Sequence, residues 1–108
     1  MTGAVNKCIL VGAISPRGCE LRSTPSGTMC CAFMLACEET WSDGKSHTML
    51  LPVEIVGKRA EALSALEPGT VVCIDGKLLR RKRDEHWETI ILAWEAVPIS
   101  AGAPAPMS

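Results

Sequence analysis

Apolar positions along the chain gather in short runs that turn signals separate. Val5–Ile14 is rich in β-forming residues, and Cys19–Ser23 is a short extended stretch that ends at a Thr-Pro-Ser-Gly turn over 24–27. Met29–Cys37 is nearly all apolar, so periodicity alone does not separate a strand from a helix there. The turn before it and the Asp43-Gly44 loop after it favour a strand that is buried on both faces.

The second half of the chain contains one helical pattern between strand-like runs. Ala60, Leu63 and Leu66 recur at helical spacing, and Pro68-Gly69 stops the helix. This pattern predicts a helix over 58–66. Around it the sequence predicts three further strands and one charged hairpin tip, namely His47–Val56, Thr70–Leu79, the tip Arg80–His86, and Trp87–Val97.

The order of the predicted elements is three strands, one helix and two strands. Gly12 and Gly76 interrupt two of the strands, as bulges or tight bends in a barrel require, and Pro52 implies an edge position or a bulge. The order predicts an all-β fold with one helix, the OB-fold, in which a five-stranded Greek-key barrel carries a helix between strands 3 and 4. We expect residues 1–97 to form this domain and 98–108 to form a flexible tail of Pro, Ala and Gly.

Length and charge narrow the possible functions. The 108 residues suit one domain, and the net charge of −1 does not by itself favour a nucleic-acid partner. No signal peptide is visible, and apolar runs such as Ile90–Trp94 are far shorter than the roughly 20 residues of a membrane helix. We therefore expect a cytoplasmic protein with no membrane partner.

The six cysteines lie mostly in apolar, strand-like runs, where they are expected to be reduced and to serve as small core side chains. No Cys-x-x-Cys pair occurs, and His47 and His86 have no cysteine at the spacing of zinc ligands. The chain also lacks the local motifs of hydrolases, metalloproteases and phosphate-binding loops. We therefore expect no catalytic residue, no metal and no cofactor, and hence no enzyme.

Five stretches, which follow one another along the chain, contain short sequence motifs. They are Val5–Gly12 (VNKCILVG), Glu20–Gly27 (ELRSTPSG), Thr40–Asp43 (TWSD), Val56–Glu61 (VGKRAE) and Pro68–Leu78 (PGTVVCIDGKL). Each is weak alone, but together they resemble the motifs of the bacterial single-stranded DNA-binding protein family. The resemblance extends over roughly residues 5–97 and implies an OB-fold.

The resemblance also implies sequence-tolerant binding of single-stranded DNA in replication, recombination or repair, and a location with the nucleoid. It implies a homo-oligomer, with a tetramer favoured and a dimer possible. The chain departs from the family at the aromatic positions on which bases stack. Two of these positions fall at about Leu50 and Arg83, which are not aromatic. At the third, before the helix, Val56 replaces the phenylalanine of the family motif. The sequence also lacks the acidic, phenylalanine-ended tip through which family members recruit other proteins.

A cationic segment, Lys77–Arg83, carries five positive charges and no negative one. On a strand that runs into a hairpin tip, one face would hold Lys77, Leu79, Arg81 and Arg83, and the other Leu78, Arg80 and Lys82. Cations on both faces indicate a projecting finger that follows phosphates, and arginine can also stack on bases. A solubilising charged hairpin, neutralised by Asp84, Glu85 and Glu88, is the alternative.

The tryptophans are the candidates for base stacking. Trp41 is the best of them because a large ring at a loop mouth is hard to bury, although it could instead be a lid on the barrel. Trp87 follows the finger and could present its ring to the same groove, whereas the alternation of Trp94 with Ile90 and Leu92 favours a core or subunit-interface position. Four single cations at motif positions complete the predicted DNA contacts: Lys7, Arg22, Lys58 and Arg59.

Two alternatives to a DNA-coating protein stay open. One is a replication-restart factor that resembles primosomal replication protein N, a dimeric, tail-less OB-fold protein with few stacking aromatics. The other is an OB-fold interaction protein that has lost most of its DNA affinity, which the near-zero net charge allows.

Overall fold

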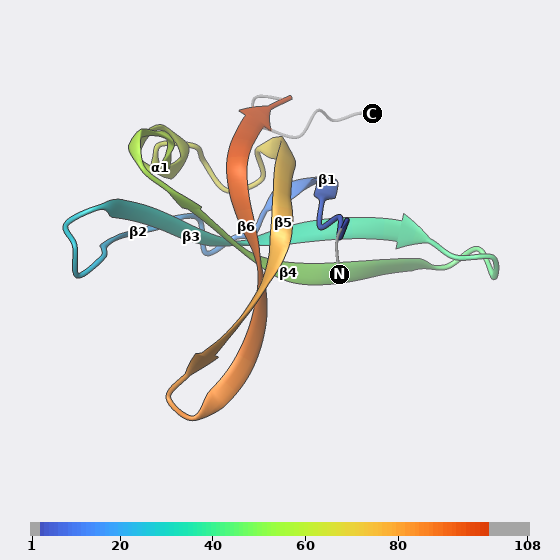
Figure 1. Ribbon diagram of the computed structural model, residues 1–108. Helices are drawn as coiled ribbons and strands as arrows, with labels where there is room; N and C mark the ends of the chain where they lie inside the picture. The colour runs from blue at the N-terminus through green and yellow to red at the C-terminus, as the bar shows by residue number, and fades with distance from the viewer. Residues whose placement is uncertain (1–2, 100–108) are drawn as a thin grey trace.

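The computed structural model describes residues 3–99, which form six strands and one helix (Figure 1). In chain order they are β1 (Cys8–Ile14), β2 (Glu20–Ser23), β3 (Met29–Thr40), β4 (Ser46–Val56), α1 (Lys58–Ser64), β5 (Val71–Arg83) and β6 (His86–Pro98). The predicted strands and helix are all present. The stretch at 19–23 is a short strand of its own, which pairs with the start of β3.

Five of the strands close into a barrel. β1 pairs along its length with β5 and, at Ala13 and Ile14, with β3, while β3 pairs with β4 and β5 with β6. Parallel pairing of β4 with β6, from Val53 to Ile55, closes the ring. Helix α1 lies between β4 and β5 in the chain and packs against β3 through the buried Ala60 and Leu63. The predicted five-stranded OB-fold barrel is therefore confirmed.

The core fills the barrel with alternate residues of each strand. On β3 these residues are Cys31, Phe33, Leu35 and Cys37, all of which are buried. The prediction that both faces of this strand are buried is wrong, because Met34 and its neighbours on the opposite face are only partly covered. That outer face is left open because no second layer of the described chain packs on it.

The predicted core cysteines are confirmed for three of the six residues. Cys30, Cys31 and Cys37 are buried, and Cys8, Cys19 and Cys73 are partly exposed. All six are free thiols. Burial raises the pKa of Cys31 to about 12, so this thiol stays protonated and packs as an apolar side chain.

Two glycines permit the close approach of strands that the barrel needs. A Cβ on Gly12 would lie 2.6 Å from the carbonyl oxygen of Ala36, and one on Gly76 would meet the backbone of Leu92. The pairing of β5 with β6 shifts register between Asp75 and Gly76, which is the predicted bulge.

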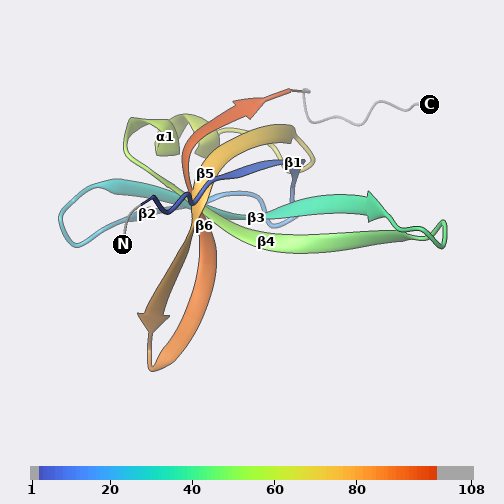
Figure 2. The same ribbon diagram turned by 45° about the vertical axis from the view of Figure 1, so that its right-hand side comes forward.

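The hairpin between β5 and β6 is longer and its turn tighter than predicted. The predicted tip at 80–86 is wrong, because strand pairing continues to Arg83 and His86 and leaves only Asp84 and Glu85 in the turn. Both turn residues have positive φ, 49° and 69°, as a two-residue hairpin turn requires. This hairpin and the β3–β4 hairpin project from the barrel in different directions in both views (Figures 1 and 2).

Smaller differences concern the ends of elements. The helix ends at Ser64 instead of residue 66, and β6 continues through Pro98, so the predicted tail cannot begin at 98. The backbone N–H of Ile99 still bonds to β5. The rest of the predicted tail lies outside the described residues. Within residues 3–99 no helix combines the length and the apolar character of a membrane span.

Candidate nucleic-acid interface

An open groove of about 610 Å³ runs over the outer face of the barrel. Its floor comes from β3 and β4, including Met34 and Pro52, and one wall comes from the β5–β6 hairpin. Four arginines line it, and they come from three different parts of the chain: Arg17, Arg22, Arg81 and Arg83. We refer to this feature as the groove, and to residues 80–89 of the β5–β6 hairpin as the arm.

Strand alternation divides the charges of the arm between two faces. Arg81 pairs across the hairpin with Glu88, and both line the groove together with Arg83. Lys82 pairs with Trp87 on the opposite face of the arm. The predicted division of the finger into two faces is therefore observed, but Trp87 does not share the groove of Arg81.

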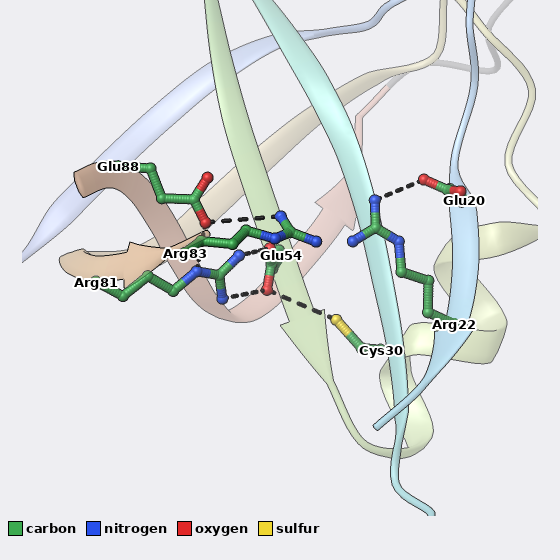
Figure 3. Close-up of polar contacts among 7 residues, drawn as sticks. All are labelled: Glu20, Arg22, Cys30, Glu54, Arg81, Arg83 and Glu88. Carbon is green, nitrogen blue, oxygen red and sulfur yellow. Dashed lines mark hydrogen bonds and ion pairs between the residues drawn. The ribbon is translucent and has the colours of Figure 1, made fainter. Parts of the chain in front are cut away.

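Two carboxylates that line the groove with it, those of Glu54 and Glu88, hold Arg81 (Figure 3). Its Nε donates to Oε2 of Glu88 at 2.6 Å, and its Nη1 donates to Oε1 of Glu54 at 3.1 Å. Its Nη2 also donates to Oε2 of Glu54. The hydrogen bonds to Glu54 and Glu88 raise the pKa of Arg81, and the hydrogen bond from Arg81 lowers that of Glu88. Three of the five N–H bonds of this guanidinium therefore donate to carboxylates.

The other two arginines that face this network are also paired. Arg22 donates to Oε1 of Glu20 at 2.7 Å, and Nη1 of Arg83 lies 3.6 Å from Oε2 of Glu88. The hydrogen bond from Arg22 lowers the pKa of Glu20. Three arginines and three glutamates thus balance one another in Figure 3.

Sequence reasoning missed Glu54, the most buried charge of the groove. Its side chain is only 13% exposed, and it also accepts a weak hydrogen bond from Sγ of Cys30 at 3.8 Å. A signal was present, because a carboxylate inside the apolar run Met49–Val56 demands a partner when buried. Arg17 was missed as well, since it lies in the turn before β2, outside every motif.

Several predicted cations lie outside the groove. Lys7 forms an ion pair with Asp75 at 3.5 Å, and Lys82 approaches Glu85 at 3.7 Å. Arg80 lies over the ring of Trp87, with 5.4 Å between the guanidinium carbon and the ring centroid. Lys77 has no ion pair with another residue of the described chain.

Trp41 occupies the turn at the end of the β3–β4 hairpin. It is 53% exposed, stacks on the ring of His47 with 3.5 Å between centroids, and donates from Nε1 to Glu39 at 3.3 Å. It is therefore no lid on the barrel, and it lies on a different hairpin from Trp87, which is 59% exposed. The structure does not bring the two predicted stacking rings together.

Trp94 lines a second hollow, of about 390 Å³, where β4 ends and α1 begins. It is 45% exposed, so the core alternative of the prediction is wrong, and the subunit-interface alternative stays a prediction. The bulge at Asp75/Gly76 is the reason, because Trp94 has no partner in the register between Ala93 and Glu95. The predicted cations Lys58 and Arg59 line the same hollow, and Nη1 of Arg59 donates to the carbonyl oxygen of Trp94 at 2.6 Å.

Among the residues that the structure describes, no three His, Cys, Asp or Glu side chains are grouped so as to hold a metal ion. The chemistry that the groove offers is that of paired and free cations beside apolar side chains, which suits a polyanion with flat bases.

Comparison with known proteins agrees with this fold. The structure is similar to the wild-type single-stranded DNA binding protein from Thermus aquaticus, with a TM-score of 0.78 and 23% identity over 89% of this chain and 50% of that one. A deletion mutant of the Thermus aquaticus protein, carrying R190A, gives a TM-score of 0.74 and 24% identity over 89% and 51% of the two chains. The chain thus spans about half the length of these proteins, and no curated protein sequence matches it.

The family comparison is more specific than the fold. The sequence pattern of the single-strand binding protein family matches residues 5–89, which is most of the described chain. Members of this family are DNA-binding proteins and not enzymes, which confirms the expectation drawn from the missing catalytic motifs. The chain belongs to the single-strand binding protein family.

Proposed function

We propose that this protein binds single-stranded DNA with little sequence preference, in replication, recombination or repair, and that the strand follows the groove. The observation that carries the proposal is the groove itself, which is open, lined by four arginines and floored by apolar side chains. Single-strand binders combine such cationic tracks with surfaces on which bases stack. The family to which the chain belongs supports the same substrate. The proposed role implies a cytoplasmic location with the nucleoid.

The cations of the groove contribute unequally to this function. Arg81 already donates three hydrogen bonds to Glu54 and Glu88, so a phosphate competes with two carboxylates for it. Arg17 is exposed and has no ion pair within residues 3–99, and Arg83 has only a long contact to Glu88. We infer that Arg17 and Arg83 meet phosphates first, and that Arg81 mainly holds the wall of the groove in place.

Stacking is proposed for the exposed tryptophans outside the groove. The guanidinium of Arg80, on the neighbouring strand, already lies over one face of the Trp87 indole. A base could therefore stack on the other face of the ring. Trp41 offers one face in the same way, because His47 covers the other. These rings would engage a strand that leaves the groove and passes around the arm or along the β3–β4 hairpin.

We further propose that the protein is a homo-oligomer, with a tetramer favoured and a dimer possible. The outer face of β1, β5 and β6 supports this, because aligned apolar side chains are left uncovered there. The exposed fractions are 62% for Ile9, 53% for Val11, 49% for Val97 and 58% for Ile99. An apolar face of this kind on a sheet usually marks an interaction surface.

An OB-fold interaction protein with weak DNA affinity is the second candidate. The charge balance of the groove favours it, since Glu20, Glu54 and Glu88 offset three of the four arginines. A replication-restart factor would fall between the two candidates, with a dimer as its expected assembly.

Fluorescence titration with oligo-dT at several salt concentrations tests the proposal. We expect quenching on binding and a fall of log K with log salt of about 0.7 for each phosphate neutralised. Arg17→Ala and Arg83→Ala should each make the slope shallower, whereas Lys7→Ala, which removes a lysine that pairs with Asp75 outside the groove, serves as the matched control. A failure to bind oligo-dT at low salt would reject the proposal and favour the interaction protein.

A further inference from the structure

Trp94 does not line the groove, and the proposed function above assigns it no contact with DNA. It is 45% exposed on a central strand of the barrel, where a tryptophan would normally be covered. The register shift opposite Asp75 and Gly76 turns it outward, after the buried Ala93. Its backbone is also fixed, because Arg59 bonds to its carbonyl oxygen at 2.6 Å.

The hollow beside Trp94 continues the groove along the same face of the barrel. Glu54, on the floor of the groove, pairs with Leu92, which lines the hollow. Val56 follows Glu54 on the outer face of β4 and lines the hollow too. The ion pair of Glu54 with Arg81 thus lies where the groove ends and the hollow begins.

The charges of the hollow differ from those of the groove. Lys58 and Arg59 line it, and none of its lining residues is acidic. Within residues 3–99, the Lys58 side chain makes no hydrogen bond or ion pair, and the Arg59 side chain uses only Nη1, for the bond to Trp94. Both side chains are therefore available to an anion, in contrast to the arginines that glutamates hold.

We propose that this hollow is a nucleotide subsite in which Trp94 stacks on one base of the bound strand and Lys58 and Arg59 contact the adjoining phosphate. The proposal rests on the proposed binding of single-stranded DNA, and it adds a binding residue that the sequence assigned to the core or an interface. A flat apolar ring beside two unpaired cations matches a nucleotide in both its parts, the base and the phosphate. Val56 and Leu92 are aliphatic and cannot stack, so Trp94 supplies the only aromatic surface among the lining residues.

A single-tryptophan reporter tests the contact directly. The double variant Trp41→Phe, Trp87→Phe leaves Trp94 as the only indole of the chain. Titration with oligo-dT should quench its fluorescence and protect it from iodide. Binding detected by a label on the DNA, with no change in Trp94 emission, would overturn the subsite.

Affinity measurements over a length series of oligo-dT provide the second test. A series from about 4 to about 40 nucleotides spans the site sizes of OB-fold proteins. We expect Trp94→Ala to weaken binding of the longer strands by roughly 5- to 140-fold, the equivalent of one lost base stack, and to affect the shortest strands least. Trp94→Phe, which keeps a ring, should recover most of the loss.

The outcomes separate this subsite from the proposed function and from a subunit interface. If the wild-type protein binds no oligo-dT, the proposed function fails first. If the wild-type protein binds but Trp94→Ala binds every length as tightly, only the subsite is overturned. If Trp94→Ala changes the molecular mass in light scattering and weakens all lengths equally, Trp94 belongs to an interface between copies, and the subsite is again overturned. Lys58→Ala should make the salt dependence shallower by about 0.7, with Lys7→Ala, outside both the groove and the hollow, as the charge-matched control.

Discussion

The carboxylate of Glu54 should limit the affinity of the groove for DNA, and Glu54→Gln tests this with the least change in shape. The glutamine keeps the size of the side chain and one oxygen acceptor, but it removes the charge that holds Nη1 and Nη2 of Arg81. The local balance of three arginines against three glutamates then shifts by one positive charge. Arg81 becomes available to a phosphate.

The expected size of the effect follows from the exposure of the pair. The Glu54 side chain is 13% exposed and that of Arg81 is 32% exposed, so the pair is only partly shielded from water. Removing one partner of a fully buried pair costs about 3–5 kcal/mol, and since Arg81 keeps Glu88 and some solvent we expect a loss of about 1–2 kcal/mol in the free energy of unfolding. One additional phosphate contact should tighten DNA binding about fivefold at low salt and steepen the salt slope by about 0.7.

The assay combines urea unfolding with oligo-dT titration at several salt concentrations. Glu85→Gln is the matched control, because it removes one negative charge from the arm at a side chain that is 90% exposed and does not touch Arg81. We expect Glu54→Gln to raise affinity more than this control while lowering stability. A folded Glu54→Gln protein whose affinity and salt slope equal those of Glu85→Gln would refute the idea that Glu54 competes with phosphate.

Three further predictions concern stability and assembly. The hydrogen bond from Arg81 lowers the pKa of Glu88 below the ordinary 4.5, so its stabilising contribution is present above that pH and is lost as the pH falls through the lower folded value. Urea midpoints measured down to about pH 3 should therefore fall, and less so in Glu88→Gln; equal acid sensitivity of the two proteins would contradict this. Gly76→Ala should destabilise the barrel by about 1–3 kcal/mol, because the new methyl group meets the backbone of Leu92, and an unchanged urea midpoint would argue against that close approach. Val11→Lys, on a side chain 53% exposed, should reduce the mass measured by light scattering without lowering the helix and strand signals in circular dichroism; an unchanged oligomer would move the interface away from β1.

The barrel could be predicted from the sequence because its signals are local. Gly12 and Gly76 marked the bends, and the spacing of Ala60 and Leu63 marked the only helix of the described chain. The turn at Asp84 and Glu85 could not be identified, since both residues adopt positive φ without the glycine or asparagine that usually announces such a turn. Without such a turn signal, the sequence predicts strands that are too short near the arm and a tip that includes residues 80–83.

The candidate site was predicted less well, because the strength of a cation depends on partners that are distant in the sequence. Glu54 lies 27 residues from Arg81 and belongs to another strand, so a count of charges over 77–83 could not include it. Strand alternation predicts the face of the arm on which each cation lies. It does not predict the ion pair that Arg81 forms with Glu54 on another strand. The same limit applies to Trp94, whose outward position depends on a register shift in the neighbouring strand β5.

These pairings change where the protein should hold DNA most tightly. Of the five cations in the segment 77–83, Arg81, Lys82 and Arg83 each face a carboxylate, and Lys77 and Arg80 face none within residues 3–99. Lys77 lies on the groove side of β5, opposite Leu92 of the Trp94 hollow, whereas Arg80 lies on the other side, over Trp87. The unpaired cations of this segment thus lie beside the exposed rings Trp87 and Trp94. A strand that follows both would contact Trp87 with Arg80 and the Trp94 hollow strongly, and the ion pairs of Arg81 with Glu54 and Glu88 weakly. Affinity should therefore rise steeply once an oligonucleotide is long enough to reach beyond those ion pairs.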